Sequence, residues 1–396
     1  MNAVPHPLRE RGIAILADLV GFPSISLRPN GDIVSHIESY LASHGIDCHR
    51  DAHEDGDRFN LLARIGPQAD GGVLLSGHLD VVPADGAGWT QDPFRLRRAD
   101  GRLYGRGAVD MKGFLAMALA MAPEFQARAA ALQEPLYLAF TFDEEIGCFG
   151  AERMPAFLAR AGATPRIAIV GEPTGMTPIN GHKGGMELVT HVRGVAGHAG
   201  KPGEGVNAIL AAARIIGFIN ETAAACAARP VAGSPFDPPF TTLSVGTIQG
   251  GEARNIIPHT CRFDWEIRAH PGDNPHHVLD QVTRFIADEV VPSMRKEHPA
   301  CEVVTEMLSD VPPLAACDGS AAAALIARLW TNQPPSVVSF GTDGAHFQQA
   351  GLDVIVIGPG GTAQMHQPDE FITEEAMDEG LLFLGRLCDE MCGQGS

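Results

Sequence analysis

The sequence lacks the short motifs that mark several common kinds of catalytic site. No Gly-x-Ser-x-Gly segment occurs, so we do not expect the nucleophile elbow of a serine hydrolase. The eight cysteines form no Cys-x-x-Cys pair, which argues against a zinc site built from thiolates. They are scattered along a chain that is long enough to fold without disulfide bonds. We therefore expect mostly buried, reduced thiols.

Long apolar runs and an excess of basic residues are also missing. The longest apolar run, 114–123, is far shorter than the roughly 18 residues that a membrane span needs. Residues 1–19 contain no apolar segment that is long enough for a signal peptide. The 48 acidic and 29 basic residues give a formal net charge of −19, which argues against a nucleic-acid-binding surface. We predict a cytoplasmic protein that binds neither nucleic acid nor a membrane.

What the sequence does contain is typical of a large globular protein. Its 396 residues are more than a single hydrophobic core usually accommodates, so two domains are expected. Of these residues 45% are hydrophobic and 19% are charged. Short apolar segments at 60–65, 73–76, 136–142 and 167–170 predict strands, and a helix is predicted at 114–125. Strands that are apolar throughout and alternate with helices predict an α/β fold with a buried, mostly parallel mixed sheet.

The middle of the chain has a different pattern. Between 185 and 312 the predicted elements follow the order βαββαβ. The predicted strand 261–268 alternates apolar and charged residues, so one face of this small sheet should be buried and the other open. The α/β pattern resumes after Pro312-Pro313. We therefore predict a discontinuous catalytic α/β domain, 1–184 and 313–396, with an inserted α+β domain, 185–312, that acts as a lid.

Acidic and histidine side chains stand at or just beyond the ends of several predicted strands, where α/β proteins place reactive groups. Each has an ordinary explanation: His78-x-Asp80 could be a surface ion pair, and 143–145 a solvated helix start. Gly105-x-Gly107 lacks the third glycine of a nucleotide loop and follows no clear strand. Taken together, these segments would deliver two histidines and three carboxylates to one edge of a sheet: His78, Asp110, Glu145, Glu172 and His366.

These segments resemble those of one enzyme family. They read Gly77-His78-Leu79-Asp80, Val109-Asp110-Met111-Lys112-Gly113, Asp143-Glu144-Glu145, Gly171-Glu172-Pro173-Thr174 and His366-Gln367-Pro368-Asp369-Glu370. In this order, over nearly the whole chain, they are similar to the acetylornithine deacetylase / succinyl-diaminopimelate desuccinylase family of zinc metallopeptidases and aminoacylases. The resemblance implies a catalytic α/β domain, an inserted lid that also forms a homodimer, and a cis peptide bond between Asp110 and Met111.

The resemblance also implies a site with two zinc ions, for which cobalt or manganese could substitute. His78 and Glu172 would hold one ion, Glu145 and His366 would hold the other, and Asp110 would bridge them. The balance of charge supports two ions independently. Three carboxylates and one bridging hydroxide carry a charge of about −4, which two Zn²⁺ ions neutralise.

By the same resemblance, Glu144 would be the general base. It would take a proton from the metal-bridging water as that water attacks the amide carbonyl. Asp80 would orient the imidazole of His78. His198 would reach the active site of the partner subunit and stabilise the oxyanion there, although a lone loop histidine is commonly structural or solvent-exposed.

Further residues are candidates for contacts with the substrate. Arg268 lies on the polar face of its predicted strand and could bind the α-carboxylate of the substrate through two parallel hydrogen bonds. Alternatively, it could form an ion pair with Glu266 or Asp264. Resemblance to family segments adds Asn255, Gly341, Thr342, Gly360 and, at the domain junction, Lys183.

The segments 171–184 and 358–370 most resemble acetylornithine deacetylases. The turn Gly341-Thr342-Asp343-Gly344 departs from them and is more similar to desuccinylases or carboxypeptidases. We predict hydrolysis of a small N-acyl amino acid, with N2-acetylornithine, cleaved to ornithine and acetate, as the leading substrate. Succinyl-diaminopimelate, other N-acyl amino acids and dipeptide or carboxypeptidase substrates are the alternatives. A non-catalytic relative is disfavoured, because Glu144 and all five ligand candidates are present.

Overall fold

A computed structural model of the chain describes residues 4–86, 88–317 and 319–394, which form two compact units. Unit 1 comprises Met1–Asn180, Ala316–Ser336 and Thr342–Ser396, and unit 2 comprises Gly181–Ala315 and Val337–Gly341. Residues 181–184, 313–315 and 337–341, which the sequence analysis assigns to the catalytic domain, belong to unit 2.

Unit 1 is built on an eight-stranded mixed sheet. The four central strands of this sheet run parallel, while β1, β2 and β8 run antiparallel to a neighbour. The predicted α/β fold is therefore confirmed. In spatial order the strands are β1 (Cys48–Ala52), β2 (Phe59–Ile65), β6 (Leu136–Thr141), β3 (Val73–His78), β7 (Ile167–Val170), β16 (Asp353–Val356), β8 (Ile179–His182) and β15 (Ser336–Val338).

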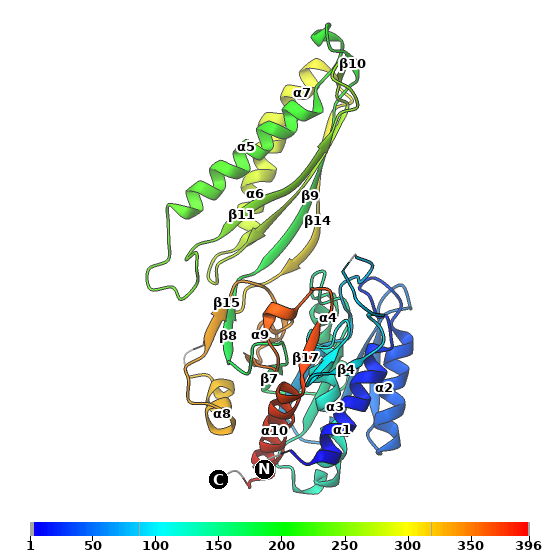
Figure 1. Cartoon of the computed structure of the whole chain (residues 1–396). Coiled ribbons are helices and arrows are strands. Elements are labelled where there is room, and N and C mark those ends of the chain that lie inside the picture. Colours follow the sequence, from blue (N-terminus) through cyan, green and yellow to red (C-terminus); the bar gives the residue numbers. More distant parts are fainter. Residues whose placement is uncertain (1–3, 87, 318, 395–396) are drawn as a thin grey trace. The chain divides into compact units, whose positions relative to one another are not determined.

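Helices cover this sheet and explain why its central strands are largely apolar. Helix α3 lies buried between α1 and α10, whereas α4 packs against α9 (Figure 1). Alternate residues of β2, namely Leu61, Ala63 and Ile65, belong to the core that α1, α3 and α10 form. The helices of unit 1 are α1 (His6–Val20), α2 (Gly31–Ser43), α3 (Lys112–Ala127), α4 (Phe149–Arg160), α8 (Ala321–Leu329), α9 (Gly344–Gln349) and α10 (Glu374–Met391), and a small separate sheet contains β4 (Arg97–Ala99), β5 (Arg102–Tyr104) and β17 (Phe371–Thr373).

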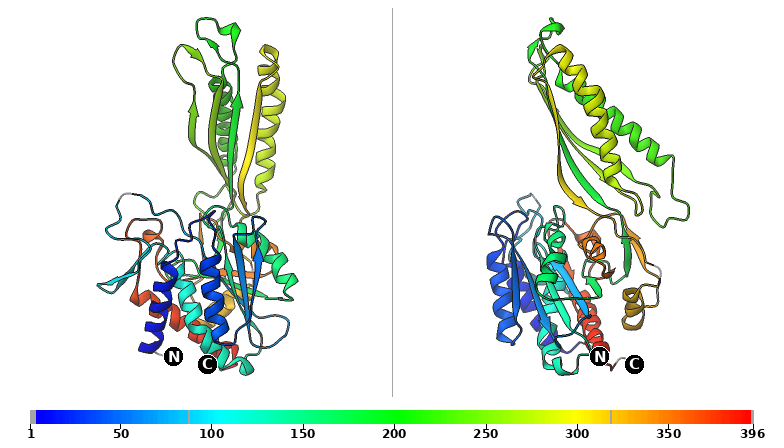
Figure 2. Two further views of the ribbon diagram at one scale, coloured as in Figure 1. Left: turned by 90° about the vertical axis from the view of Figure 1, so that its right-hand side faces the viewer. Right: turned by 180° about the vertical axis from the view of Figure 1, so that it is seen from behind.

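Unit 2 contains a four-stranded antiparallel sheet with helices on one face (Figure 2). The strands lie in the order β11 (Thr242–Gly250), β13 (Thr260–Arg268), β9 (Gly185–Arg193) and β14 (Glu302–Val311), and the helices are α5 (Ala208–Ala227), α6 (Pro275–Phe285) and α7 (Val291–Glu297). In β13, Phe263, Trp265 and Ile267 are buried, whereas the alternate residues Asp264 and Glu266 are partly exposed. Two short strands, β10 (Gly197–His198) and β12 (Ile256–Ile257), pair separately.

Helix α5 is the one helix of the described residues that is long and apolar enough to cross a membrane, judged by length and composition alone. Arg214 and Glu221 interrupt its apolar residues, so it is not the longest apolar run of the sequence, which is 114–123. Ala211, Ile215 and Ile219 on this helix belong to the core of unit 2. Core helices of globular proteins meet the same criterion, so this finding is weak evidence for a membrane span.

Candidate active site

The parallel strands of unit 1 bring the predicted ligands to one edge of the sheet. His78 is the last residue of β3, whereas Glu145 follows β6 and Glu172 follows β7. Asp110 precedes α3, and His366 lies in the loop after β16. Because β6, β3, β7 and β16 are neighbours and parallel, their carboxyl ends meet at the same edge.

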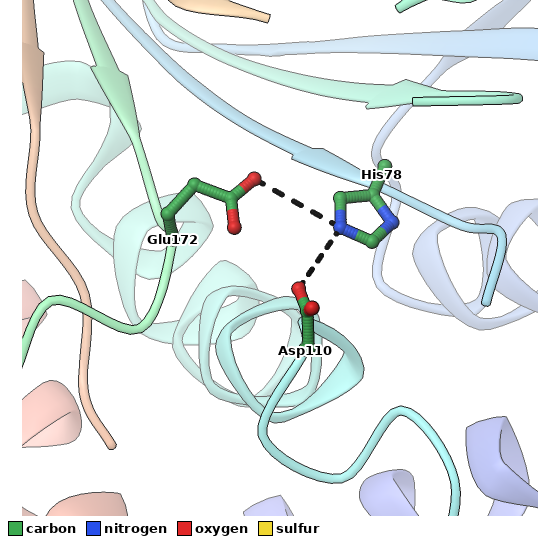
Figure 3. Close-up of side chains that lie close together, drawn as sticks. All are labelled: His78, Asp110 and Glu172. Atoms are coloured by element: carbon green, nitrogen blue, oxygen red, sulfur yellow. Dashed lines mark hydrogen bonds and ion pairs between the residues drawn. The ribbon is translucent and has the colours of Figure 1, made fainter. Parts of the chain in front are cut away.

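One group of side chains consists of His78, Asp110 and Glu172, all three buried (Figure 3). The Nε2 atom of His78 lies 3.2 Å from Oδ1 of Asp110 and 3.8 Å from Oε1 of Glu172. One oxygen or nitrogen atom from each residue lies within 4.8 Å of the other two. These three atoms are therefore close enough to one another to hold one metal ion.

A second group consists of Asp110, Glu145 and His366. The Nε2 atom of His366 lies 3.1 Å from Oδ2 of Asp110 and 2.9 Å from Oε2 of Glu145. Asp110 thus belongs to both groups, with Oδ1 facing His78 and Oδ2 facing His366. A carboxylate whose two oxygens face two separate sets of donors has the geometry of a bridging ligand.

The carboxylate of Glu144 lies beside these groups without belonging to either. Its Oε2 atom is 3.9 Å from Nε2 of His78. Burial, followed by the negative charge of Glu172, raises the pKa of Glu144 well above its ordinary value. A carboxyl group in this position, close to the ligand candidates and readily protonated, suits proton transfer.

The role expected for the Asp80 carboxylate needs a correction. Nδ1 of His78 lies 2.9 Å from the main-chain carbonyl oxygen of Asp80, whereas the Asp80 carboxylate is 3.6 Å away. A carbonyl oxygen accepts, so Nδ1 carries the proton and Nε2 is left for a metal. The carboxylate instead accepts hydrogen bonds from the backbone N–H groups of Glu144 and Glu145, at 3.0 and 3.3 Å, and from the hydroxyl of Ser26.

The surroundings of several ligand candidates favour their protonated forms. Burial raises the pKa of Glu145 to about 7, with the charge of Asp110 adding to the effect. Burial also raises the pKa of Glu172 well above its ordinary value. Hydrogen bonds to Asp110 and Glu145 raise the pKa of His366 to about 10. A cation that entered this site would replace these protons.

The donor set fits two divalent metal ions. Oε1 of Glu172 is buried, and within the described part of the chain it has no hydrogen-bond partner. Coordination would satisfy this oxygen, which is otherwise costly to bury. Imidazole and carboxylate donors without thiolates are typical ligands of catalytic zinc, and of manganese or cobalt.

Comparison with known proteins identifies the family. The model of the peptidase family M20/M25/M40 matches residues 74–390. This chain belongs to that family. It is 36% identical over 386 residues to an acetylornithine deacetylase from Myxococcus xanthus, which covers 96% of this chain and 97% of the relative. It is 32% identical over 387 residues to an acetylornithine deacetylase from Proteus mirabilis, with 96% of each protein covered.

The fold of the chain is also that of this family. An M20 family metallo-carboxypeptidase from Sulfolobus solfataricus has a TM-score of 0.76 and 17% sequence identity, covering 96% of this chain and 99% of the other. The cis peptide bond expected from the family resemblance joins Asp110 to Met111.

Glu370, to which the sequence analysis gave no role, organises the loop before Asp110 in this family member. Its buried carboxylate accepts hydrogen bonds from the backbone N–H groups of Gly107, Val109 and Asp110 at 2.9 to 3.1 Å. It also pairs with the guanidinium of Arg106 at 2.7 Å. The only signal in the sequence was its place in the segment 366–370, because the loop that it binds lies far away along the chain.

Two candidates for substrate contacts lie in unit 1. Thr342 is fully buried, and its hydroxyl accepts a hydrogen bond from the N–H of Gly344 at 3.2 Å. Gly360 has a φ of 85°, and a Cβ atom there would lie 2.4 Å from Cγ2 of Val109. Position 360 therefore requires glycine, both for the backbone conformation and for the close packing against Val109.

The remaining candidates lie in unit 2. His198 and Asn255 are exposed and close together, because β10 pairs with β12 and the Asn255 carbonyl accepts from the N–H of Ala199. Arg268 pairs with Glu266 at 2.8 Å. Lys183 is buried, which lowers its pKa, and it donates to the carbonyl of Phe240 at 2.9 Å. Gly341 ends the short segment of unit 2 that precedes Thr342.

Proposed function

We propose that this protein is a two-zinc amidohydrolase that removes the acyl group from an N-acyl amino acid. The observation that carries the proposal is the position of Asp110, whose two oxygens face separate groups of donors while the carboxylate of Glu144 stands beside them. The M20/M25/M40 family and the two acetylornithine deacetylases support a hydrolase that acts on linear amides.

In this proposal His78 and Glu172 hold one zinc ion, His366 and Glu145 hold the other, and Asp110 binds both. Cobalt or manganese can substitute, because both accept the same oxygen and nitrogen donors. When bound, the ions polarise the amide carbonyl and lower the pKa of the attacking water.

Glu144 acts as the general base. Its carboxylate accepts a proton from the water that attacks the carbonyl carbon, and it returns that proton to the nitrogen of the leaving amine. Asp80 fixes the backbone that carries Glu144 and Glu145, because its carboxylate accepts hydrogen bonds from both N–H groups. The base and one metal ligand are thereby held by the same residue.

The other proposed contacts involve unit 2 and a second copy of the chain. Unit 2 acts as a lid and forms a homodimer, in which His198 donates to the oxyanion in the partner's active site. β11 and β14 are the two edge strands of its sheet, and edge strands are commonly covered by pairing with another chain. Arg268 exchanges Glu266 for the α-carboxylate of the substrate, and Asn255, Lys183, Gly341, Thr342 and Gly360 complete the substrate site. We further propose that the protein acts in the cytoplasm.

N2-acetylornithine is the proposed substrate, since both curated relatives described above are acetylornithine deacetylases. A panel of N2-acetylornithine, N-succinyl-diaminopimelate, an N-acetyl neutral amino acid and a dipeptide tests this choice on zinc-loaded protein. We expect kcat/KM for N2-acetylornithine to exceed the others by at least about tenfold, the discrimination that one well-matched side-chain pocket supplies. Faster cleavage of the succinyl compound or of the dipeptide would reassign the substrate and leave the hydrolase class intact.

The pKa shifts predict that the stabilising effect of zinc grows with pH. In the metal-free protein Glu145 has its pKa raised from 4.5 to about 7, so the folded state holds a proton that the unfolded state loses. Stability therefore falls as pH rises between these values. The pKa of His366 is raised from 6.5 to about 10 in the folded state. Protonated His366 therefore adds stability that is complete below about pH 6.5 and is lost as pH rises toward 10. The metal-free protein should thus have a higher Tm at pH 5 than at pH 8.

Zinc replaces these protons, so its own affinity should rise over the same range. At zinc a thousandfold above Kd the stabilisation is about 4 kcal/mol. We expect thermal melts of stripped and reloaded protein to diverge progressively from pH 5 to pH 8. A zinc-dependent Tm increase that is constant with pH would contradict the assignment of Glu145 and His366 as ligands.

A further inference from the structure

A cysteine thiol lies close to one buried and one partly buried carboxyl group next to the proposed metal site. The sulfur of Cys148 is 3.8 Å from Oε1 of Glu144. This sulfur, one oxygen of Glu144 and one oxygen of Asp343 all lie within 4.8 Å of one another. Cys148 is 2% exposed and Asp343 is 1% exposed. Neither residue has a role in the function proposed above.

The surroundings of the thiol keep its proton in place. Burial, followed by the charges of Glu144 and Asp343, raises the pKa of the Cys148 thiol well above its ordinary value. A protonated thiol that faces carboxylate oxygens can act only as a donor toward them. One Asp343 oxygen accepts from the hydroxyl of Thr141 at 2.6 Å, and the Asp343 carboxylate also interacts with the Cys148 thiol, so it is a second possible acceptor for the S–H group.

The two oxygens of Glu144 therefore have different surroundings. Oε1 faces the thiol of Cys148, and Oε2 faces the imidazole of His78 at 3.9 Å. A hydrogen bond to Oε1 fixes the rotation of the carboxylate about its terminal torsion, which is otherwise broad. Oε2 is then directed toward the ligand candidates.

The backbone gives a second reason to assign a role to this side chain. Cys148 has a φ of 55°, in the left-handed region that residues other than glycine seldom occupy. It immediately precedes α4, and its N–H donates to the carbonyl of Glu144 at 3.0 Å. Residues other than glycine in such strained backbone conformations are common at functional sites. The conformation holds the side chain in a defined position.

We propose that Cys148 is a positioning residue, whose S–H group donates a hydrogen bond to Oε1 of Glu144 and so holds Oε2 ready to accept the proton of the attacking water. This inference rests on the proposed function of Glu144 as general base. Asp343 lies beside the thiol and contributes negative charge that keeps it protonated. The alternative, in which Glu144, Cys148 and Asp343 bind a third cation, is an outcome that the tests below detect.

Three substitutions at Cys148 separate the hydrogen bond from packing and backbone strain. We expect Cys148→Ala to lower kcat by about tenfold, as for loss of one hydrogen bond to a charged group, with KM and zinc content unchanged. Cys148→Gly should be equally slow although it relieves the backbone. Cys148→Ser should recover most of the activity, because its hydroxyl can donate. Cys388→Ala, at another buried cysteine of unit 1, should lower stability but leave kcat unchanged.

Infrared spectroscopy tests the hydrogen bond without any turnover. The difference spectrum between metal-free wild type and Cys148→Ala isolates the S–H stretching band of Cys148, which should lie at low frequency and move upward in Glu144→Ala. The proposal would be overturned if Cys148→Ala kept the wild-type kcat, or if the S–H band did not shift in frequency in Glu144→Ala. It would also be overturned if the wild type bound a third metal ion that Cys148→Ala lost. Failure of wild type to hydrolyse any amide would refute the proposed function instead, and the band would still report the hydrogen bond.

Discussion

Replacing Glu144 with glutamine should lower kcat by about 10² to 10⁴, the range typical of a lost general base. The substitution preserves size and removes only the ability to accept a proton. Because Glu144 belongs to neither group of ligand candidates, zinc content and KM should change little. Steady-state kinetics and elemental analysis of the same preparation measure both quantities.

Glu145→Gln is the matched control, since it makes the same chemical change one residue away. Oε2 of Glu145 lies 2.9 Å from Nε2 of His366, so this variant should lose one zinc ion per chain along with its activity. If Glu144→Gln lost zinc and Glu145→Gln retained it, the roles of the two residues would have to be exchanged.

The second large effect concerns His198. Its Nδ1 atom accepts a hydrogen bond from the N–H of Gly200 at 3.0 Å, so a neutral ring carries its proton on Nε2. This exposed N–H group is the donor that we assign to the oxyanion of a partner subunit. Removing one such donor costs about 10² to 10³ in kcat, and His198→Ala should show a loss of this size.

Mixing His198→Ala chains with Glu144→Gln chains should restore activity. In a mixed dimer, the chain that carries His198→Ala keeps its own Glu144 and receives an intact His198 from its partner. With random exchange between subunits of a symmetric dimer, about a quarter of wild-type activity is expected. Co-purification of two differently tagged chains would establish that exchange has taken place. Absence of complementation after proven exchange would place His198 within its own subunit or outside the mechanism.

The sequence was most informative where a residue's role follows from its place on a strand. Apolar strands that alternate with helices imply a buried parallel sheet, and the structure contains one in unit 1. The carboxyl ends of parallel strands share an edge, so His78, Glu145 and Glu172 could be expected near one another before any coordinates were known. Strands with polar sequences were missed: β1, at the edge of the sheet, reads Cys-His-Arg-Asp-Ala.

Helices were missed where local signals were weak or overlooked. Helix α10 has a Thr373 cap that accepts from the N–H of Ala376, followed by acidic residues in its first turn, and both features are visible in the sequence. Helix α4 contains Pro155 and begins after Cys148 in a left-handed conformation, which no propensity would anticipate.

By itself, the sequence determined the α/β class, the alternating burial of β13 and the residue types that gather at one sheet edge. Only the tertiary structure decided which atoms meet: that the main chain of Asp80 binds His78, that Glu370 holds the loop before Asp110, and that a thiol faces Glu144. Periodicity fixes the face on which a side chain lies, because it follows from the geometry of one strand or helix. Contacts between atoms of distant segments depend on how loops close over the sheet edge, and no local pattern encodes that.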